Sequence, residues 1–82
     1  MAKLVFLGRL EDIAGAAELS LPLSGATSIA AIAERLPAEL AEALRNPKIR
    51  IAVNGELASA GGWNVLVADA DEVAFLPPVS GG

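Results

Sequence analysis

Short runs of apolar and β-branched residues predict β-strands at residues 3–7, 18–21, 48–53 and 72–76. The first run is apolar on both of its alternating faces, and a strand that is covered on both sides usually lies in the middle of a sheet. The second run alternates polar and apolar residues, which indicates a strand with one solvated face. We therefore expect residues 3–7 at the centre of a sheet.

The connection between the first two strands is short. Residues 8–17 contain one predicted helical turn at residues 10–14, which Gly15 ends. Pro22 ends the second strand. A connection of this length has no room for a parallel crossover, so we expect the two strands to form an antiparallel hairpin.

A helical pattern occupies the middle of the chain. Thr27 or Ser28 can cap the start of a helix, and Pro37 forces a break after Leu36. Pro37 is also a favourable first residue for a second helical segment at residues 38–45. The expected inner face comprises Ile29, Ile32, Ala33 and Leu36 in the first segment, and Leu40, Ala43 and Leu44 in the second.

Turn signals divide the last part of the chain. Asn54-Gly55 is the strongest of them, and it separates the third predicted strand from a short returning strand at residues 56–58. Trp63 is expected as a core or rim residue over the sheet. A tight acidic turn at residues 69–71 precedes the last strand.

The predicted order is strand, strand, helix, strand, short strand, strand. A last strand that joins the first in parallel, under a crossing helix, gives a mixed sheet. We predict an α+β domain with the ubiquitin-like β-grasp fold, with four to five strands crossed by one main helix. The domain would span residues 1–76, and a flexible C-terminal Gly-Gly tail would span residues 77–82.

Composition narrows the function. The 82 residues suffice for one domain, and the net charge of −4 without a basic cluster argues against nucleic acid or an anionic membrane as partners. The chain has no cysteine and no histidine, which excludes disulfides, thiolate nucleophiles and the usual general base; no metal site is expected. The opening apolar run is too short for a signal peptide or a membrane span, so we expect a cytoplasmic protein.

The C-terminal residues form an unusual tail. Pro77 and Pro78 have no amide hydrogen, so they cannot continue a β-ladder and favour an extended chain that projects from the body. Gly81 and Gly82 have no Cβ, which makes the end of the tail thin. A thin rod that ends in a carboxylate suits insertion into a narrow site on another protein, whereas a Gly-Gly pair alone would indicate a frayed end.

Residues 69–82, an acidic turn and strand followed by Pro-Pro-Val-Ser-Gly-Gly, resemble the C-terminal signature of the small subunit of molybdopterin synthase, the MoaD family. Residues 5–15 resemble the first strand and loop of that family, and residues 52–55 resemble its central strand and turn. Two features depart from the family pattern. Ala70 stands where the family usually has glycine, and residues 58–67 are longer and richer in glycine.

The resemblance implies a sulfur carrier that is not an enzyme by itself. An ATP-using activating enzyme would adenylate the Gly82 carboxylate, and a persulfide donor would convert it to a thiocarboxylate. In molybdopterin synthase, a hetero-oligomer expected to be a heterotetramer, the large subunit would supply the catalytic residues and direct the sulfur to cyclic pyranopterin monophosphate. The resemblance implies no permanently bound cofactor, because the ATP belongs to the activating enzyme.

The resemblance also implies which residues contact the partners. Leu76, directly before the prolines, is the best candidate for an exposed apolar anchor, followed by Leu7 and Leu57. The alternative is that all three are core leucines. The implied partner-binding residues are Gly81, Ser80, Val79, Pro78, Pro77, Leu76, Leu57 and Leu7, and Gly82 is the reacting residue.

Three other functions fit parts of this pattern. A ubiquitin-like protein modifier would share the adenylation step but would end in an isopeptide bond between Gly82 and a lysine of a target. A sulfur carrier of thiazole biosynthesis fits residues 75–82 less well. A small β-grasp interaction module with an incidental Gly-Gly end is the third.

Overall fold

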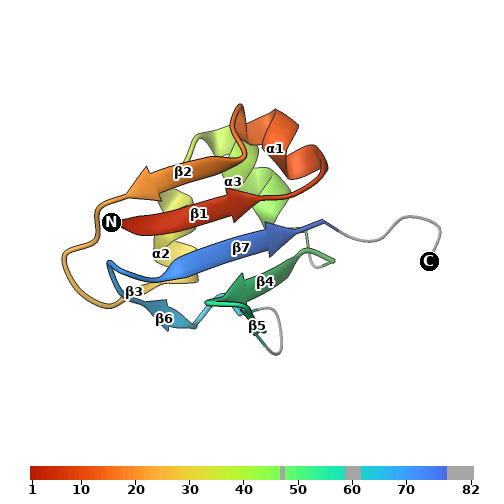
Figure 1. Cartoon of the computed structure of the whole chain (residues 1–82). Helices are drawn as coiled ribbons and strands as arrows, with labels where there is room; N and C mark the ends of the chain where they lie inside the picture. The colour runs from red at the N-terminus through yellow and green to blue at the C-terminus, as the bar shows by residue number, and fades with distance from the viewer. Residues whose placement is uncertain (47, 59–61, 78–82) are drawn as a thin grey trace.

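The structure is a computed structural model that describes residues 1–46, 48–58 and 62–77. Its largest element is a five-stranded mixed sheet with strand order β2-β1-β7-β4-β5 (Figure 1). The first and last strands of the chain are parallel neighbours in this sheet, and the other neighbouring pairs are antiparallel. The strands are β1 (Ala2–Phe6), β2 (Glu18–Leu21), β4 (Arg50–Val53), β5 (Glu56–Leu57) and β7 (Glu72–Leu76).

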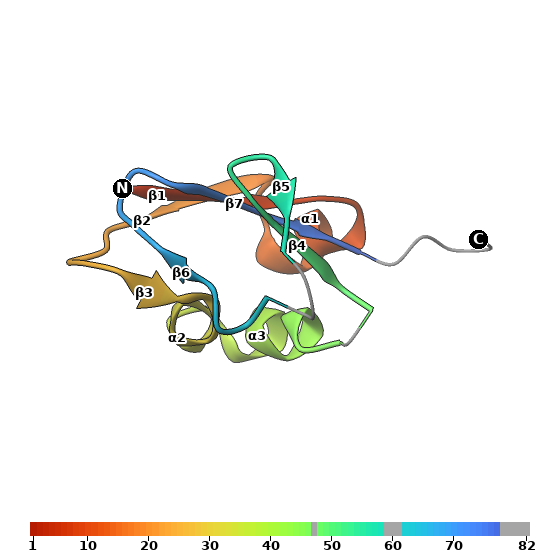
Figure 2. The same ribbon diagram turned by 90° about the horizontal axis from the view of Figure 1, so that it is seen from below.

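Within the described residues, three short helices lie on one face of this sheet (Figure 2). They are α1 (Arg9–Ala14), α2 (Ile29–Glu34) and α3 (Ala38–Leu44). The crossing connection, predicted as one main helix, is divided into α2 and α3 because Pro37 cannot continue a helix. Within the described ranges, no helix combines the length and the apolar character that a membrane span needs.

The core lies between the helices and the inner face of the sheet, where β1 and β7 meet. Leu4 and Phe6 of β1 are in register with Val73 and Phe75 of β7, and all four side chains are fully buried. The rings of Phe6 and Phe75 stack with their centroids 5.5 Å apart. The parallel pair therefore carries the largest buried side chains of the sheet.

The prediction that β1 is covered on both faces is wrong, although its interior position in the sheet is confirmed. Leu4 and Phe6 are buried, but Lys3 is exposed and Leu7, just after the strand, is 42% exposed. The reason is that the helices cover one face only. The interior position of β1 comes from its hydrogen-bonded neighbours β2 and β7.

A second, two-stranded sheet was not predicted from the sequence. It pairs β3 (Thr27–Ser28) with β6 (Leu66–Val67). Ser28 belongs to β3 and also forms the predicted helix cap. Its Oγ accepts a hydrogen bond from the amide of Ala31 at 3.1 Å. Trp63 precedes β6 and packs, partly buried, against the core, as expected.

The two predicted tight turns are present. Asn54 and Gly55 both have positive φ, 51° and 86°, and connect β4 to β5 as a hairpin. In the acidic turn, the Asp71 amide donates to the carbonyl of Ala68 at 3.0 Å. Among the described residues, Asn54 is the only non-glycine residue with positive φ, so the alanine at position 70 fits this turn without strain.

Candidate functional site

The face of the sheet opposite the helices, here called the outer face, carries an apolar row across four strands. Val5 of β1 lies opposite Ala74 of β7. Ala74 lies opposite Ala52 of β4, and Ala52 lies opposite Leu57 of β5. Because side chains alternate along a strand and Leu4 is buried under the helices, this row faces away from them. Leu57 is 62% exposed.

The other two predicted leucines lie beside this row, at the end of β7. Leu76 is partly buried and pairs with Arg50 of β4. Leu7 follows β1, where its amide donates to the carbonyl of Phe75 at 3.2 Å. The structure thus brings all three predicted leucines to the outer face, and none of them belongs to the buried core. We call Val5, Leu7, Ala52, Leu57, Ala74 and Leu76 the outer patch.

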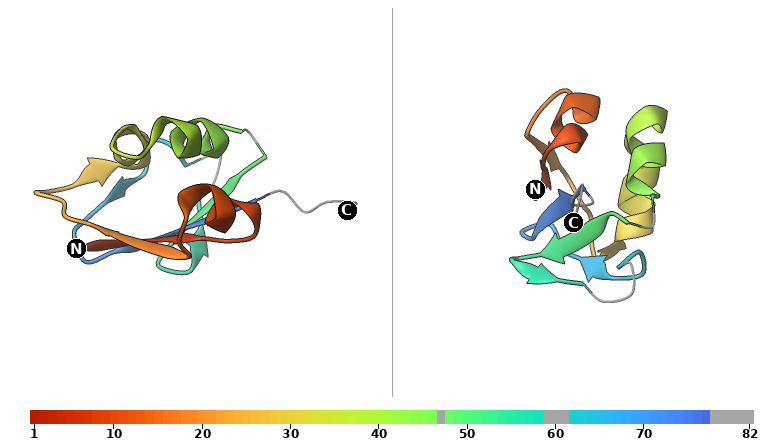
Figure 3. Two further views of the ribbon diagram at one scale, coloured as in Figure 1. Left: turned by 90° about the horizontal axis from the view of Figure 1, so that it is seen from above. Right: turned by 90° about the vertical axis from the view of Figure 1, so that its right-hand side faces the viewer.

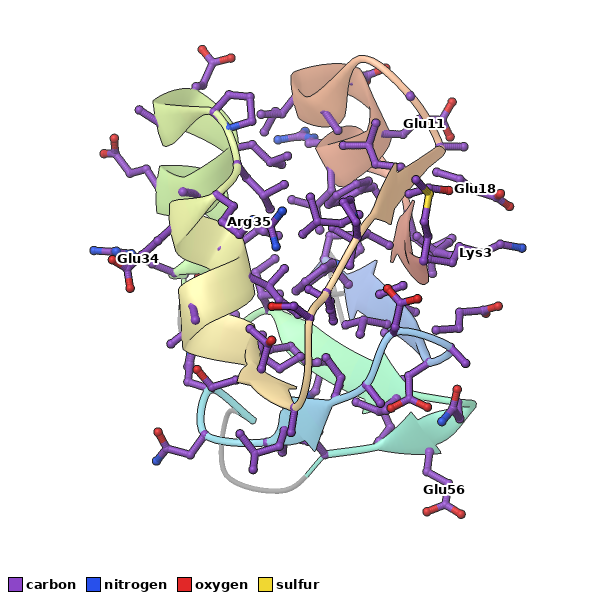
Figure 4. All side chains as sticks on the ribbon, turned by 90° about the vertical axis from the view of Figure 1, so that its left-hand side faces the viewer. Lys3, Glu11, Glu18, Glu34, Arg35 and Glu56 are labelled. Carbon is purple, nitrogen blue, oxygen red and sulfur yellow. The ribbon has the colours of Figure 1, made fainter. Side chains whose placement is uncertain are left out.

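Charged side chains border the outer patch. Lys3 and Glu18 point away from the helices (Figure 4), and the Lys3 Nζ lies 3.7 Å from a Glu18 carboxylate oxygen. Glu72 pairs with Lys3 in the sheet register, and Arg50 lies beside Leu76. An apolar centre with a polar rim is the usual composition of a protein–protein interface. The outer face therefore has the composition of a docking surface.

The structure describes only the root of the predicted tail. Leu76 is the last residue of β7, and Pro77, which follows it, is partly buried. The root lies at the same end of the sheet as Leu7. The predicted residues Pro78, Val79, Ser80, Gly81 and Gly82 lie outside the described residues, and their roles stay predictions.

The acidic turn lies at the opposite end of β7 from the tail (Figure 1). Asp69 accepts hydrogen bonds from the N-terminal ammonium and from the amide of Leu23, both at 2.8 Å. These bonds hold the pKa of Asp69 below its ordinary value, and the ammonium contributes most. The turn thus ties the N-terminus and the segment after β2 to the start of β7.

Asp71 joins the same turn to the β4–β5 hairpin. Its carboxylate accepts hydrogen bonds from the amide of Ala68 at 2.8 Å and from Nδ2 of Asn54 at 3.1 Å. The bond from Ala68 is the main reason that the pKa of Asp71 lies below its ordinary value, and the Asn54 bond adds to it. Because both aspartates are engaged in these hydrogen bonds, the acidic part of the C-terminal signature has a structural role in this fold.

Sequence reasoning missed four residues near the candidate site. Val5, Ala52 and Ala74 complete the outer patch, but only the strand register shows that they lie in one row. Gly8 lies directly against Pro77. No sequence signal identified this contact, because it joins residues that are far apart in the chain. Within the described ranges, no group of three or more histidine, cysteine, aspartate or glutamate residues could hold a metal ion.

Comparison with protein families matches residues 4–82 to the ThiS family. No curated protein sequence matches the chain significantly. Among solved structures, SAMP1 from Haloferax volcanii is 27% identical, with a TM-score of 0.73 and coverage of 99% of this chain and 98% of that chain. The small archaeal modifier protein 1 from Methanosarcina acetivorans is 29% identical, with a TM-score of 0.71 and coverage of 99% and 95%.

A third solved structure has the description expected from the resemblance. The putative molybdopterin converting factor, subunit 1, from Pyrococcus furiosus is 23% identical, with a TM-score of 0.72 and coverage of 95% of this chain and 97% of that chain. At this identity the likeness shows the fold alone. Together with the strand order, these neighbours confirm the predicted α+β, ubiquitin-like β-grasp fold.

Proposed function

Since the chain belongs to the ThiS family of ubiquitin-like sulfur carriers, we propose that it donates sulfur in the biosynthesis of molybdopterin. The sulfur is held as a thiocarboxylate on Gly82, and cyclic pyranopterin monophosphate receives it within molybdopterin synthase. The choice of this pathway rests on residues 75–82, which resemble the molybdopterin synthase small subunit. The adenylating enzyme and the synthase large subunit are the proposed partners.

The observation that carries this proposal is the position of the outer patch beside the root of the tail. Leu7 and Leu76 lie in the patch at the end of the sheet from which Pro77 departs. A partner that covers the patch therefore also holds the first residue of the tail. Binding energy gained on the patch can then be used to position a reacting group at the end of the chain.

The chemistry requires groups that this chain lacks. The Gly82 carboxylate attacks the α-phosphate of ATP, pyrophosphate leaves, and an acyl-adenylate forms. A persulfide on a partner then attacks the acyl carbon, and AMP leaves. A partner thiol cleaves the sulfur–sulfur bond, which leaves one sulfur on Gly82 and a disulfide on the partner. All thiols must come from partners because this chain has no cysteine.

Transfer to the pterin precursor also depends on the partner. The synthase large subunit supplies the general acid–base groups, since this chain has no histidine. The chain itself contributes the docking surface and the sulfur. It needs no resident cofactor for this role, and the consumption of ATP by the activating enzyme is consistent with a cytoplasmic site of action.

A second candidate function is protein modification. It is favoured by the identity of 27% and 29% to two archaeal proteins, one of which is described as a small archaeal modifier protein. A modifier and a sulfur carrier share the acyl-adenylate. They differ in the nucleophile that replaces AMP, which is a lysine amine in one case and a persulfide in the other.

Mass spectrometry separates the two functions. The chain is incubated with ATP, a persulfide donor and the adenylating enzyme of its source organism. We expect a mass gain of one oxygen-to-sulfur exchange at Gly82, and conversion of the pterin precursor once the large subunit is added. Conjugates on lysines of other proteins that resist reducing agents, without any thiocarboxylate, would instead establish the modifier.

Deletion of Gly82 is the sharpest control for this chemistry. The variant lacks the reacting carboxylate at its normal position, and Gly81→Ala widens the end of the tail. We expect both variants to lose sulfur transfer and to keep the thermal unfolding curve of the parent chain. Normal transfer by the deletion variant would contradict the proposed mechanism.

A further inference from the structure

The backbone of Gly8 lies against the ring of Pro77, the first residue of the tail. A Cβ on Gly8 would lie 2.9 Å from Cγ of Pro77 and 3.8 Å from its Cδ. In proteins, a Cβ atom essentially never lies closer than 3.0 Å to a heavy atom of a residue elsewhere in the chain. A side chain at position 8 would therefore force either the proline ring or the backbone of residue 8 to shift.

Gly8 is held firmly by the elements on both sides of it. Before it, the amide of Leu7 donates to the carbonyl of Phe75 at 3.2 Å, which ties the end of β1 to β7. After it, the amide of Glu11 donates to the carbonyl of Gly8 at 3.1 Å in the first turn of α1. Its dihedral angles, φ 59° and ψ −133°, are strained for residues with a Cβ. The backbone of Gly8 is thus held in place where it contacts the ring of Pro77.

Pro77 depends on packing because it cannot donate a hydrogen bond. The sheet register ends at the pair of Leu76 with Arg50, and the proline has no amide hydrogen to extend it. Pro77 lines an open surface groove of about 760 Å³ between α1 and α3. These two helices stand side by side on the inner face of the sheet (Figure 3). The contact with Gly8 is therefore one that limits where the ring can lie.

We propose that Gly8 is a positioning residue that seats the ring of Pro77 and so fixes the direction in which the tail leaves the sheet. The φ angle of proline is fixed near −65°, so the place of its ring also sets the course of its backbone. A partner that covers the outer patch then meets a tail whose first residue is already oriented. Orientation before binding lowers the entropic cost of reaching the reactive geometry. We call the contact between Gly8 and Pro77 the seat. Its use in adenylation and transfer rests on the proposed function, but the contact itself is a property of this chain alone.

The seat can be tested on the isolated chain with a matched pair of glycine variants. Gly15 has a φ of +79°, and a Cβ built on it meets nothing within 4 Å. Gly15→Ala therefore introduces backbone strain without a steric contact, whereas Gly8→Ala introduces both. Because the chain has no cysteine, Ser20→Cys and Ser80→Cys provide the only sites for a pair of spin labels.

We expect Gly8→Ala to shift or broaden the distance distribution between the two labels, and Gly15→Ala to leave it as in the parent chain. Pro77→Ala removes the ring without straining residue 8, so it should broaden the distribution even if Gly8→Ala fails to fold. Identical distributions in the parent chain and in Pro77→Ala would overturn the proposal.

The consequence for the reaction is measured with the adenylating enzyme that charges the parent chain. We expect kcat/KM for charging to fall about tenfold in Gly8→Ala, because misplacing a reactant by about 1 Å can cost up to 100-fold. Gly15→Ala should keep the parent value. The double variant Gly8→Ala, Pro77→Ala should be no slower than Gly8→Ala alone, because the ring that the Cβ at position 8 would meet is then absent.

The possible failures are distinguishable. If losses in the double variant multiply, the two residues act separately and the seat is overturned. If the label distances respond but charging does not, the positioning role in the reaction is overturned. If no adenylating enzyme charges the parent chain, the proposed function fails, while the label distances still decide whether Gly8 seats the tail.

Discussion

The two faces of the sheet are built from alternate residues of the same strands. Both are apolar, but they differ in the burial and the size of their side chains. On β7, Val73 and Phe75 point toward the helices and are fully buried, whereas Ala74 and Leu76 face outward and are only partly buried. The inner face is filled by large side chains that interlock with the helices. The outer face carries alanines in the middle of its row and exposed leucines near its margins.

This difference teaches that an apolar residue in a strand does not by itself indicate the core. The inner side chains gain stability from burial within the chain. The outer patch gains little from folding, because Leu7 and Leu57 stay in contact with solvent. An exposed apolar patch with a charged rim is typical of a surface that is covered by a partner. The four predictions that follow test this division, from the largest expected effect to the smallest.

A large loss of stability is expected from Phe75→Ala on the inner face. Its ring stacks on Phe6 and is fully buried, so its removal leaves a cavity. We expect a loss of about 3–5 kcal/mol in the free energy of unfolding, measured by urea titration. Leu76→Ala on the outer face of the same strand is the matched control and should cost much less. Equal losses would show that the two faces do not differ in their contribution to stability.

A loss of binding rather than stability is expected from Leu57→Glu on the outer face. A leucine anchor in an interface contributes about 2 kcal/mol, or roughly a 30-fold change in affinity. We expect that loss in calorimetric titration with the large subunit, and a change in unfolding free energy within about 0.5 kcal/mol.

Leu66→Glu is the matched control, since Leu66 is also 62% exposed but lies on the two-stranded sheet with β3. It should bind like the parent chain. Equal losses of affinity in both variants would remove the distinction between the outer patch and other exposed leucines. Leu76→Glu should also weaken binding, and a large drop in its melting temperature would instead assign Leu76 to the core.

Asn54→Ala is expected to have a smaller effect, which includes both the stability of the chain and the binding of a partner to the outer patch. Asn54 Oδ1 accepts from the amide of Glu72 at 2.9 Å, and its Nδ2 donates to Asp71, so it ties the β4–β5 hairpin to β7. We expect a loss of about 1–2 kcal/mol in unfolding free energy, because two hydrogen bonds and a favourable positive-φ residue are lost.

The same variant should loosen β5 and so weaken binding through Leu57, which amide hydrogen exchange of β5 would detect. Asn54→Gly separates the two causes, because it keeps the backbone conformation and removes only the side-chain bonds. Full stability of Asn54→Gly would assign the whole effect to the backbone conformation.

The smallest effect on stability is expected from a change of pH. It acts through the acidic turn at residues 69–71 and not through either face of the sheet. The folded-state pKa values of Asp69 and Asp71 lie below their ordinary values. Their contribution to stability is therefore present above the unfolded pKa of about 3.9 and is lost as the pH falls through the folded values. We expect the urea midpoint to drop below about pH 4, and Asp71→Asn to reduce the drop.

Local patterns predicted most elements of the fold. Glu18–Leu21 and Glu72–Leu76 were predicted with their observed bounds, because alternation and turn residues act over a few neighbours. The cap at Ser28 and the break at Pro37 were also found from local chemistry. The β3–β6 sheet was missed because two residues are too few to form a pattern. β4 begins at Arg50, two residues later than predicted, and strand pairing decides where such an element starts.

The candidate site was predicted only in part for a similar reason. The Gly-Gly end and the prolines are visible in the sequence, and the family resemblance pointed to Leu7, Leu57 and Leu76. The sequence alone left open whether these leucines lie in the core, because a strand with apolar residues on both faces can be covered on either side. Only the helices, all on one face, assign them to the outer patch.

The sequence by itself determined the type of most elements, the turn at Asn54-Gly55 and the chemistry available to the chain, because these depend on single residues and their near neighbours. The tertiary structure decided which side of each strand is buried, which residues form the row from Val5 to Leu57, and that Gly8 meets Pro77. Apart from the Ala52–Leu57 pair of the β4–β5 hairpin, these contacts join residues far apart in the chain. They exist only once β7 has paired with β1 on one side and with β4 on the other, and the pairing of strands that are distant in the chain has no local signal in the sequence.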